Sequence, residues 1–197
     1  VAVRKVVSDD PPLHPSLAEE ISRKAEKPIV SPEQAIILAN ELFGLKARPD
    51  SVKDLDSYDD RNFYMRASHA RRELSDPADG NGASTAESHF VLKVHNGIES
   101  LNPSFIECQN LAMEAVRRSG VWCPRALPAL DGKAIARTKL PLASGIERNH
   151  AVRCLPYRPG GLLADAILSE HLLRELGTVT ARLSGALKDF DHPAAHR

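Results

Sequence analysis

A single lysine, Lys93, stands inside a short segment that otherwise has the pattern of a β-strand. Phe90, Leu92 and Val94 occupy one face of that predicted strand, and Lys93 lies on the opposite face. Strand interiors favour β-branched and aromatic residues, so a lysine at this position is unusual. Two interpretations fit: a residue exposed on a half-buried sheet, or an ammonium group that binds the phosphates of a nucleotide.

A phosphate-binding lysine needs a carboxylate that fixes its side chain, and the following helix offers two. The sequence predicts this helix between Asn102, a capping residue type, and Gly120, a typical helix end. Glu107 and Glu114 lie seven residues apart and therefore on one face of the helix. Either glutamate is a candidate partner for Lys93, although both also fit ordinary surface positions.

An acidic segment precedes the lysine. Four carboxylates fall within the seven residues from Asp54 to Asp60, between two predicted strands. A tight connection there would expose backbone N–H groups, which can bind phosphate oxygens without a glycine-rich sequence. A hairpin turn that binds nothing explains the same residues equally well.

A third segment, Leu155–Gly161, contains two prolines and two glycines. These residues end a strand predicted over 149–155 and open a hinge before a helical region. Backbone groups at such a strand end can hydrogen-bond a purine base, and a simple linker is the alternative interpretation.

Several elements would position these groups. Residues 31–34 (SPEQ) have the types of a capping box and predict a helix that ends at Gly44. Phe63, Met65 and Ala67 alternate with polar residues, which predicts a strand that pairs antiparallel with 90–94 across the polar segment 69–88.

Further elements follow towards the end of the chain. Asp131-Gly132 predicts a hairpin between strands at 124–130 and 133–139. A stripe of apolar residues predicts a helix that starts after Ser169 and reaches Phe190. The predicted fold class is therefore α+β, with a mainly antiparallel sheet of about five strands and one helix packed across it.

The first 30 residues contain four prolines and no sustained apolar period. They are predicted to form a mobile lead-in, although a short helix around 17–27 is compatible with the pattern.

Composition excludes several classes of protein. The 197 residues carry 26 Lys+Arg and 26 Asp+Glu, so no net charge attracts nucleic acid or an anionic membrane. No apolar run approaches the roughly 20 residues of a membrane-spanning helix. Three widely spaced cysteines exclude a disulfide scaffold and fit a reducing, cytoplasmic location. We expect no nucleic-acid or membrane partner, and the oligomeric state stays open.

Four strings occur in a fixed order along the chain: SYDDRNF at 57–63, FVLKV at 90–94, IECQN at 106–110 and VRCLPYRPG at 152–160. Together they resemble the amino-terminal lobe of the aminoglycoside phosphotransferase family, which has a kinase-like fold. The resemblance extends from about Pro32 to Arg197 and so covers most of the chain. The order and spacing of the strings carry the resemblance more than any one of them.

The resemblance implies a domain organisation and a function. Residues 31–156 would form a nucleotide-binding lobe, and 157–197 the hinge and the first helices of an incomplete second lobe. The implied activity is transfer of phosphate from ATP or GTP, with Mg²⁺, to a hydroxyl group of a small amino acid such as hydroxylysine. The implied nucleotide-binding residues are a loop over the phosphates, a lysine with its glutamate partner, and a hinge that meets the base: Ser57, Tyr58, Asp59, Asp60, Asn62, Lys93, Glu107, Leu155 and Tyr157. Glu107 is preferred over Glu114 because it matches the IExQN pattern of the family.

The family's catalytic loop, HGDxxxxN, and its metal-binding Asp do not occur in these 197 residues. We therefore predict no catalytic and no metal-binding residue within the chain, and the resemblance implies that the Mg²⁺ ligands lie outside it. A chain truncated before the catalytic loop is expected to be inactive alone and to expose Leu176, Leu183 and Leu187. Two alternatives stay open: a non-catalytic nucleotide-binding or interaction module, and a related phosphotransferase that acts on another hydroxylated amine.

Overall fold

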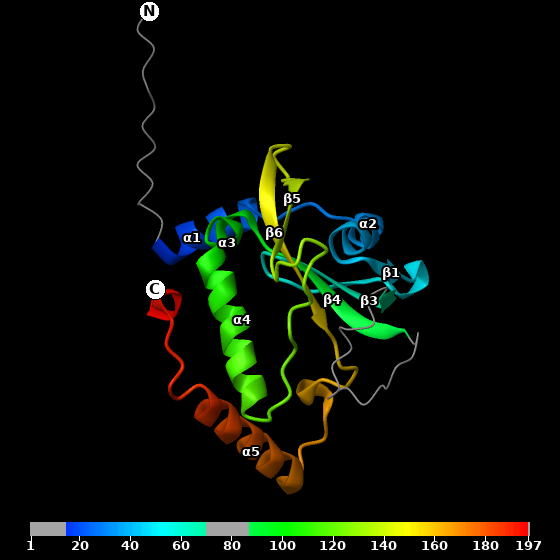
Figure 1. Ribbon diagram of the computed structural model, residues 1–197. Helices are drawn as coiled ribbons and strands as arrows, with labels where there is room; N and C mark the ends of the chain where they lie inside the picture. The colour runs from blue at the N-terminus through cyan, green and yellow to red at the C-terminus, as the bar shows by residue number, and fades with distance from the viewer. Residues whose placement is uncertain (1–14, 70–86, 197) are drawn as a thin grey trace, which may run out of the picture.

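A computed structural model describes residues 15–69 and 87–196, which form helices around one six-stranded antiparallel sheet. The strand order is β1-β3-β4-β6-β5, and β2 also pairs with β3 (Figure 1). The strands are β1 (Leu45–Ala47), β2 (Lys53–Leu55), β3 (Arg61–His69), β4 (Ser88–Val94), β5 (Ala136–Pro141) and β6 (Glu147–Pro156). The expected antiparallel pairing of 61–69 with 88–94 is confirmed.

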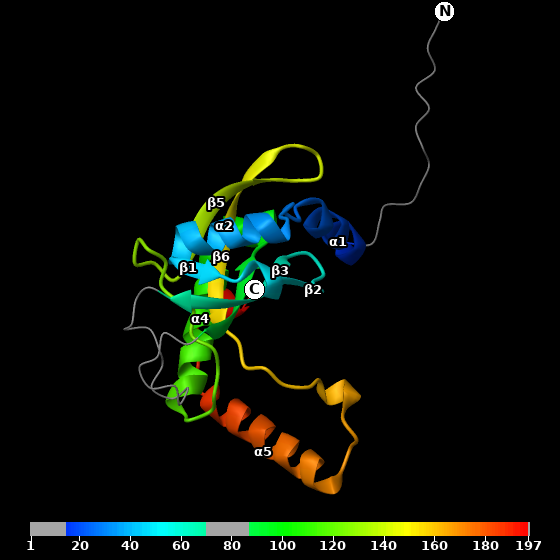
Figure 2. The same cartoon turned by 90° about the vertical axis from the view of Figure 1, so that its right-hand side faces the viewer.

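The helices lie on both faces of this sheet and beyond it. Figures 1 and 2 show α2 across one face of the sheet, α4 running away from the sheet, and α5 next to the far end of α4. None of the helices within residues 15–69 and 87–196 is both long and apolar enough to cross a membrane. The α-helices are α1 (Pro15–Ala25), α2 (Pro32–Phe43), α3 (Gly97–Leu101), α4 (Pro103–Arg118) and α5 (Glu170–Ala186), and short 3-10 helices lie at Pro49–Ser51, Leu163–Asp165 and Pro193–His196.

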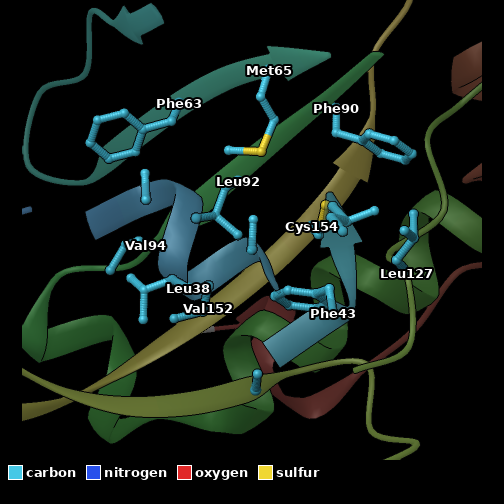
Figure 3. Packing of buried hydrophobic residues seen from close by; sticks show 14 of the residues in the cluster. Leu38, Phe43, Phe63, Met65, Phe90, Leu92, Val94, Leu127, Val152 and Cys154 are labelled. Carbon is cyan, nitrogen blue, oxygen red and sulfur yellow. The ribbon is translucent and has the colours of Figure 1, made fainter. Parts of the chain in front are cut away.

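The apolar core lies between α2 and one face of the sheet. Alternate residues of β3, β4 and β6 point towards Leu38 and Phe43 of α2 (Figure 3). The sheet residues that this face contributes include Phe63, Met65, Leu92, Val94, Val152 and Cys154, all completely buried. Because successive side chains of a strand point to opposite faces, Lys93 lies on the other face of the sheet, as the sequence predicts.

The start and end of α2 follow the predicted capping residues. The Ser31 hydroxyl accepts a hydrogen bond from the Gln34 N–H at 3.2 Å, and the Gln34 side chain accepts one from the Ser31 N–H at 2.8 Å. Gly44 ends the helix with φ of 68°, a left-handed conformation that glycine adopts without steric cost. This capping box fixes where the helix begins relative to the core.

The tight turn predicted at Asp131-Gly132 forms, with the Gly132 N–H donating to the Ala129 carbonyl at 2.9 Å, but the hairpin predicted around it is wrong. Residues 124–130 form no strand, and β5 instead pairs with β6 through a turn at residues 142–146. Pro124 and Pro128 have no N–H to donate to a ladder. The Leu127 N–H still donates to the Cys154 carbonyl at 2.8 Å, so this segment follows the edge of β6 without forming a strand.

The helix predicted after Ser169 is confirmed, with the Ser169 side chain accepting from the Leu172 N–H at 3.1 Å. It ends at Ala186 rather than at Phe190. Leu176 and Leu183 are exposed, as expected, whereas Leu187 is partly buried.

Within the predicted lead-in, residues 15–30 include the short helix that the sequence allows around 17–27. They contain α1, and Ile29 donates from its N–H to the Pro141 carbonyl at 2.9 Å. The Gly97 N–H donates to the Glu26 carbonyl at 2.9 Å. Tertiary contacts therefore order a segment whose composition alone favours disorder. Residues 1–14 and most of the predicted connection 69–88 lie outside the described residues.

Leu92→Ala should lower the free energy of unfolding by about 2–5 kcal/mol, because it opens a cavity in the completely buried core. Ile37→Ala is the matched control, since Ile37 lies on the exposed side of α2 at 52% exposure and should cost about 0.5 kcal/mol. Urea unfolding of both variants measures the difference. Equal losses would contradict the placement of the core between α2 and the sheet.

Candidate functional site

The face of the sheet opposite the core carries two neighbouring rows of side chains. The strand register places Asn62 and Arg153 directly across from Lys93, one on each side. The adjacent row, two residues further along the strands, is apolar and aromatic and lies about 7 Å away. It consists of Tyr64, Val91 and Leu155.

Lys93 is held by a carboxylate from the preceding loop. Its ammonium group forms an ion pair with Oδ2 of Asp60, while Oδ1 of the same carboxylate accepts from the Asn96 N–H at 2.9 Å. Asp60 is 5% exposed as a residue, and the Lys93 side chain is 24% exposed. The lysine is therefore paired but still accessible from solvent.

The acidic loop is fastened to α1. The Arg23 guanidinium contacts Asp59 at 2.5 Å and Glu99 of α3 at 2.9 Å. The Lys27 ammonium donates to the Ser57 carbonyl at 2.7 Å. The exposed Tyr58 ring lies 4.8 Å from the Lys24 ammonium nitrogen.

A buried arginine stands beside Lys93 on the sheet. Arg153 is 3% exposed and donates to Gln109 at 2.6 Å and to Asn110 at 2.7 Å, both on α4. Its Nε also donates to Nε2 of His95 at 3.1 Å. Because arginine has no acceptor, Nε2 of His95 accepts this bond, and the ring proton is assigned to Nδ1, which donates to Glu99 at 2.7 Å.

The pKa values of this cluster follow from burial and pairing. Burial lowers the pKa of His95, and the hydrogen bond to Glu99 only partly opposes this effect. The hydrogen bond from His95, supported by Arg23, lowers the pKa of Glu99 to about 2 although burial opposes the shift. Burial also lowers the pKa of Arg153. At neutral pH the cluster therefore contains a neutral His95 and an ionised Glu99.

Asp60, His95 and Glu99 place ligand atoms within 4.8 Å of one another, the kind of grouping that can hold a metal ion. In this structure the two carboxylates are already paired with the side chains of Lys93 and Arg23. The three residues are thus accounted for as an ion-pair network, because nearby cations would repel a metal ion.

The apolar row continues into the predicted hinge. The Tyr64 and Tyr157 rings pack in a T-shaped arrangement, with 5.3 Å between centroids, and Tyr157 is 39% exposed. The Tyr157 N–H donates to the His89 carbonyl at 2.8 Å, and the Tyr64 hydroxyl lies 2.6 Å from Nδ1 of His89. Leu155 pairs across the strands with Val91.

The ion pair expected between Lys93 and Glu107 is not among the ion pairs of the described residues. Ile106 and Cys108 point inward and are buried, which turns Glu107 to the exposed side of α4. Glu114 lies instead within 3.6 Å of Arg117. Asp60 thus takes the place expected for a glutamate of the helix, and the nucleotide-binding role of Glu107 stays a prediction.

The structure brings together Asp60, Asn62 and Lys93, and it places Leu155 and Tyr157 at the neighbouring apolar row. Ser57, Tyr58 and Asp59 lie on the same loop, but Tyr58 and Asp59 contact α1 and Ser57 contacts Lys27 just after that helix. Five residues that complete the network and the apolar row are not among the predicted site residues: Arg23, Tyr64, His95, Glu99 and Arg153. The sequence does contain a signal for Arg153, since this residue interrupts an apolar strand as Lys93 does.

No protein-family model matches the sequence. Hydroxylysine kinase from Danio rerio is 32% identical over 173 residues, which cover 88% of this chain and 43% of the relative. Hydroxylysine kinase from Mus musculus is 29% identical over 172 residues, which cover 87% of this chain and 42% of the relative. The chain is similar to hydroxylysine kinases over most of its length. It spans less than half the length of these relatives.

The structure of amicoumacin kinase hAmiN in complex with AMP-PNP, Ca²⁺ and Ami superimposes with a TM-score of 0.58. The match has 15% sequence identity and covers 89% of this chain and 44% of that kinase. The fold is therefore kinase-like, which confirms the predicted α+β fold class.

The low pKa of Glu99 predicts how the free energy of unfolding changes at acidic pH. A carboxyl whose pKa is about 2 when folded and 4.5 ordinarily stabilises the fold above about pH 4.5. This contribution, up to about 3 kcal/mol, is lost as the pH falls towards 2. Glu99→Gln should therefore lose less stability than the unsubstituted protein when urea unfolding is compared between pH 5.5 and pH 3. Glu107→Gln, on the exposed side of α4, should keep the original pH profile, and parallel profiles for all three proteins would contradict the assignment.

Proposed function

We propose that this chain is the nucleotide-binding part of a kinase that transfers a phosphoryl group from ATP or GTP to a hydroxyl of a small hydroxylated amino acid. Similarity to hydroxylysine kinases over 88% of the chain supports kinase chemistry, and the name of these relatives supports hydroxylysine as the acceptor. The acceptor rests on the relatives alone, because no residue described above is assigned to bind it.

One observation carries the nucleotide part of the proposal. Lys93, whose ammonium group is accessible, belongs to a row of side chains about 7 Å along the strands from an apolar row that ends at two packed tyrosines. A nucleotide has the same division, with a charged triphosphate at one end and a flat apolar base at the other. The proposed arrangement puts the phosphates at Lys93 and the base against Tyr64, Leu155 and Tyr157.

The residues present fit such a ligand in a second respect. Oδ1 of Asn62 is buried and has no hydrogen-bond partner in the described part of the chain. Asn62 lies directly across from Lys93, so this acceptor without a partner lies beside the proposed phosphate site.

Within the proposed kinase, this chain's residues orient the nucleotide and balance its charge. Lys93 neutralises phosphate oxygens, and the Arg153 hydrogen bonds to Gln109 and Asn110 hold β6 against α4. Phosphoryl transfer depends mainly on such positioning and on electrostatic stabilisation. Bound Mg²⁺ would supply further neutralisation of the phosphates, and we propose that its ligands lie outside these residues.

Lys93→Ala should weaken ATP binding by at least about tenfold, since a charge-assisted contact is worth about 1.5–3 kcal/mol. Lys46→Ala is the matched control, because Lys46 is exposed on β1 and should leave the affinity unchanged. Isothermal titration calorimetry measures both, with circular dichroism as a check that each variant is folded. Unchanged ATP affinity in the folded Lys93→Ala variant would rule out the phosphate-binding role.

The acceptor substrate can be tested with the longest natural form of the protein that contains these residues. With Mg²⁺ and either ATP or GTP, we expect phosphate transfer to hydroxylysine and none to lysine, which differs only by the hydroxyl. Transfer to a different hydroxylated amine would instead identify a related phosphotransferase. Nucleotide binding without transfer to any acceptor would favour a non-catalytic nucleotide-binding module.

A further inference from the structure

The carboxylate that holds Lys93 belongs to the loop predicted to cover the phosphates. Asp60 contacts the same ammonium group that the proposed nucleotide needs. An ammonium group has three N–H donors, but a carboxylate and a phosphate bound to it together lie close enough to repel each other strongly. Occupation by one anion therefore disfavours the other.

We propose that Asp60 is an internal anion that occupies Lys93 until a nucleotide phosphate displaces it. The proposal rests on the proposed nucleotide-binding function and adds to it a built-in competitor that lowers the apparent affinity for phosphorylated ligands. In general, the apparent affinity for a ligand decreases when a smaller fraction of the protein is in the binding-competent state.

Displacement leaves Asp60 with a second partner. Its Oδ1 accepts from the Asn96 N–H at 2.9 Å, and this bond does not involve the lysine. The carboxylate therefore stays partly satisfied when its Oδ2 loses the ammonium group, which keeps the cost of the exchange moderate.

The loop also has an anchor that is independent of Lys93. Arg23 joins the neighbouring Asp59 to Glu99, and Lys27 binds the Ser57 carbonyl. These contacts keep the loop near the sheet while Asp60 changes partner. A small movement of one side chain, rather than loss of the whole loop, is thus sufficient to open the cationic site.

Asp60→Asn tests the proposal because it removes the negative charge and keeps the shape of the side chain and an oxygen for the Asn96 N–H. Calorimetry should show ATP binding at least about fivefold tighter than in the unsubstituted protein, the lower range of typical coupling between sites. Adenosine, which has no phosphate, should bind unchanged. Asp54→Asn is the control, since Asp54 pairs with Arg61 at 2.6 Å on the same hairpin and not with Lys93.

The outcomes separate this proposal from the function on which it rests. ATP binding that is unchanged or weaker in Asp60→Asn would show that Asp60 positions Lys93 rather than competes for it. Equal tightening for ATP and adenosine would also overturn the proposal, because the effect would then not involve phosphate. Failure of both the unsubstituted protein and the variant to bind ATP would overturn the nucleotide-binding function itself.

A measurement on the unsubstituted protein covers the case in which the variant does not fold. The ¹³C resonance of the Asp60 carboxyl group should shift when ATP saturates the site and should stay in place with adenosine. A resonance that does not move at saturating ATP would contradict displacement.

Discussion

Two cations that face each other across neighbouring strands impose the main constraint on this fold. Lys93 of β4 and Arg153 of β6 are directly paired in the register, on the face that α2 does not cover. Like charges placed opposite each other destabilise a sheet, and Arg153 is almost completely buried. The surrounding elements must therefore supply carboxylates and hydrogen-bond acceptors, and their arrangement follows from this need.

The structure meets the constraint by giving the two cations different kinds of partner. Lys93 receives a full negative charge from Asp60, whereas Arg153 receives neutral acceptors from α4 and from His95. The neutral imidazole of His95 in turn donates a hydrogen bond to Glu99, and Arg23 of α1 balances the charge of that carboxylate. The result is a continuous polar network that joins α1, the acidic loop, α3, α4 and two strands. This explains why a segment with a composition typical of disorder forms an ordered helix.

Sequence patterns predicted the parts of the fold that depend on local chemistry. The capping box of α2, the alternation in β3 and β4 and the start of α5 all follow from residue types within a few positions. The failures share a different cause. The strand predicted over 124–130 does not form because its prolines cannot donate to a ladder. The short helix that became α1 was only an alternative in the sequence, because its stability comes from partners 36 and 76 residues away. Of the candidate site, the position of Lys93 on the face opposite the core was predictable, but the identity of its carboxylate was not.

The identity of that carboxylate affects how the site can behave. A glutamate on α4 would hold the lysine independently of the loop. The lysine and the loop would then respond separately to a ligand. Here Ile106 and Cys108 are buried on the inner side of α4, and Glu107 is exposed. The carboxylate that pairs with Lys93 therefore comes from the loop itself. The charge presented by Lys93 is therefore controlled by a side chain of the loop. One oxygen of Asp60 pairs with the lysine and the other accepts from the Asn96 N–H, so Asp60 can release the lysine while Arg23 and Lys27 keep the loop in place.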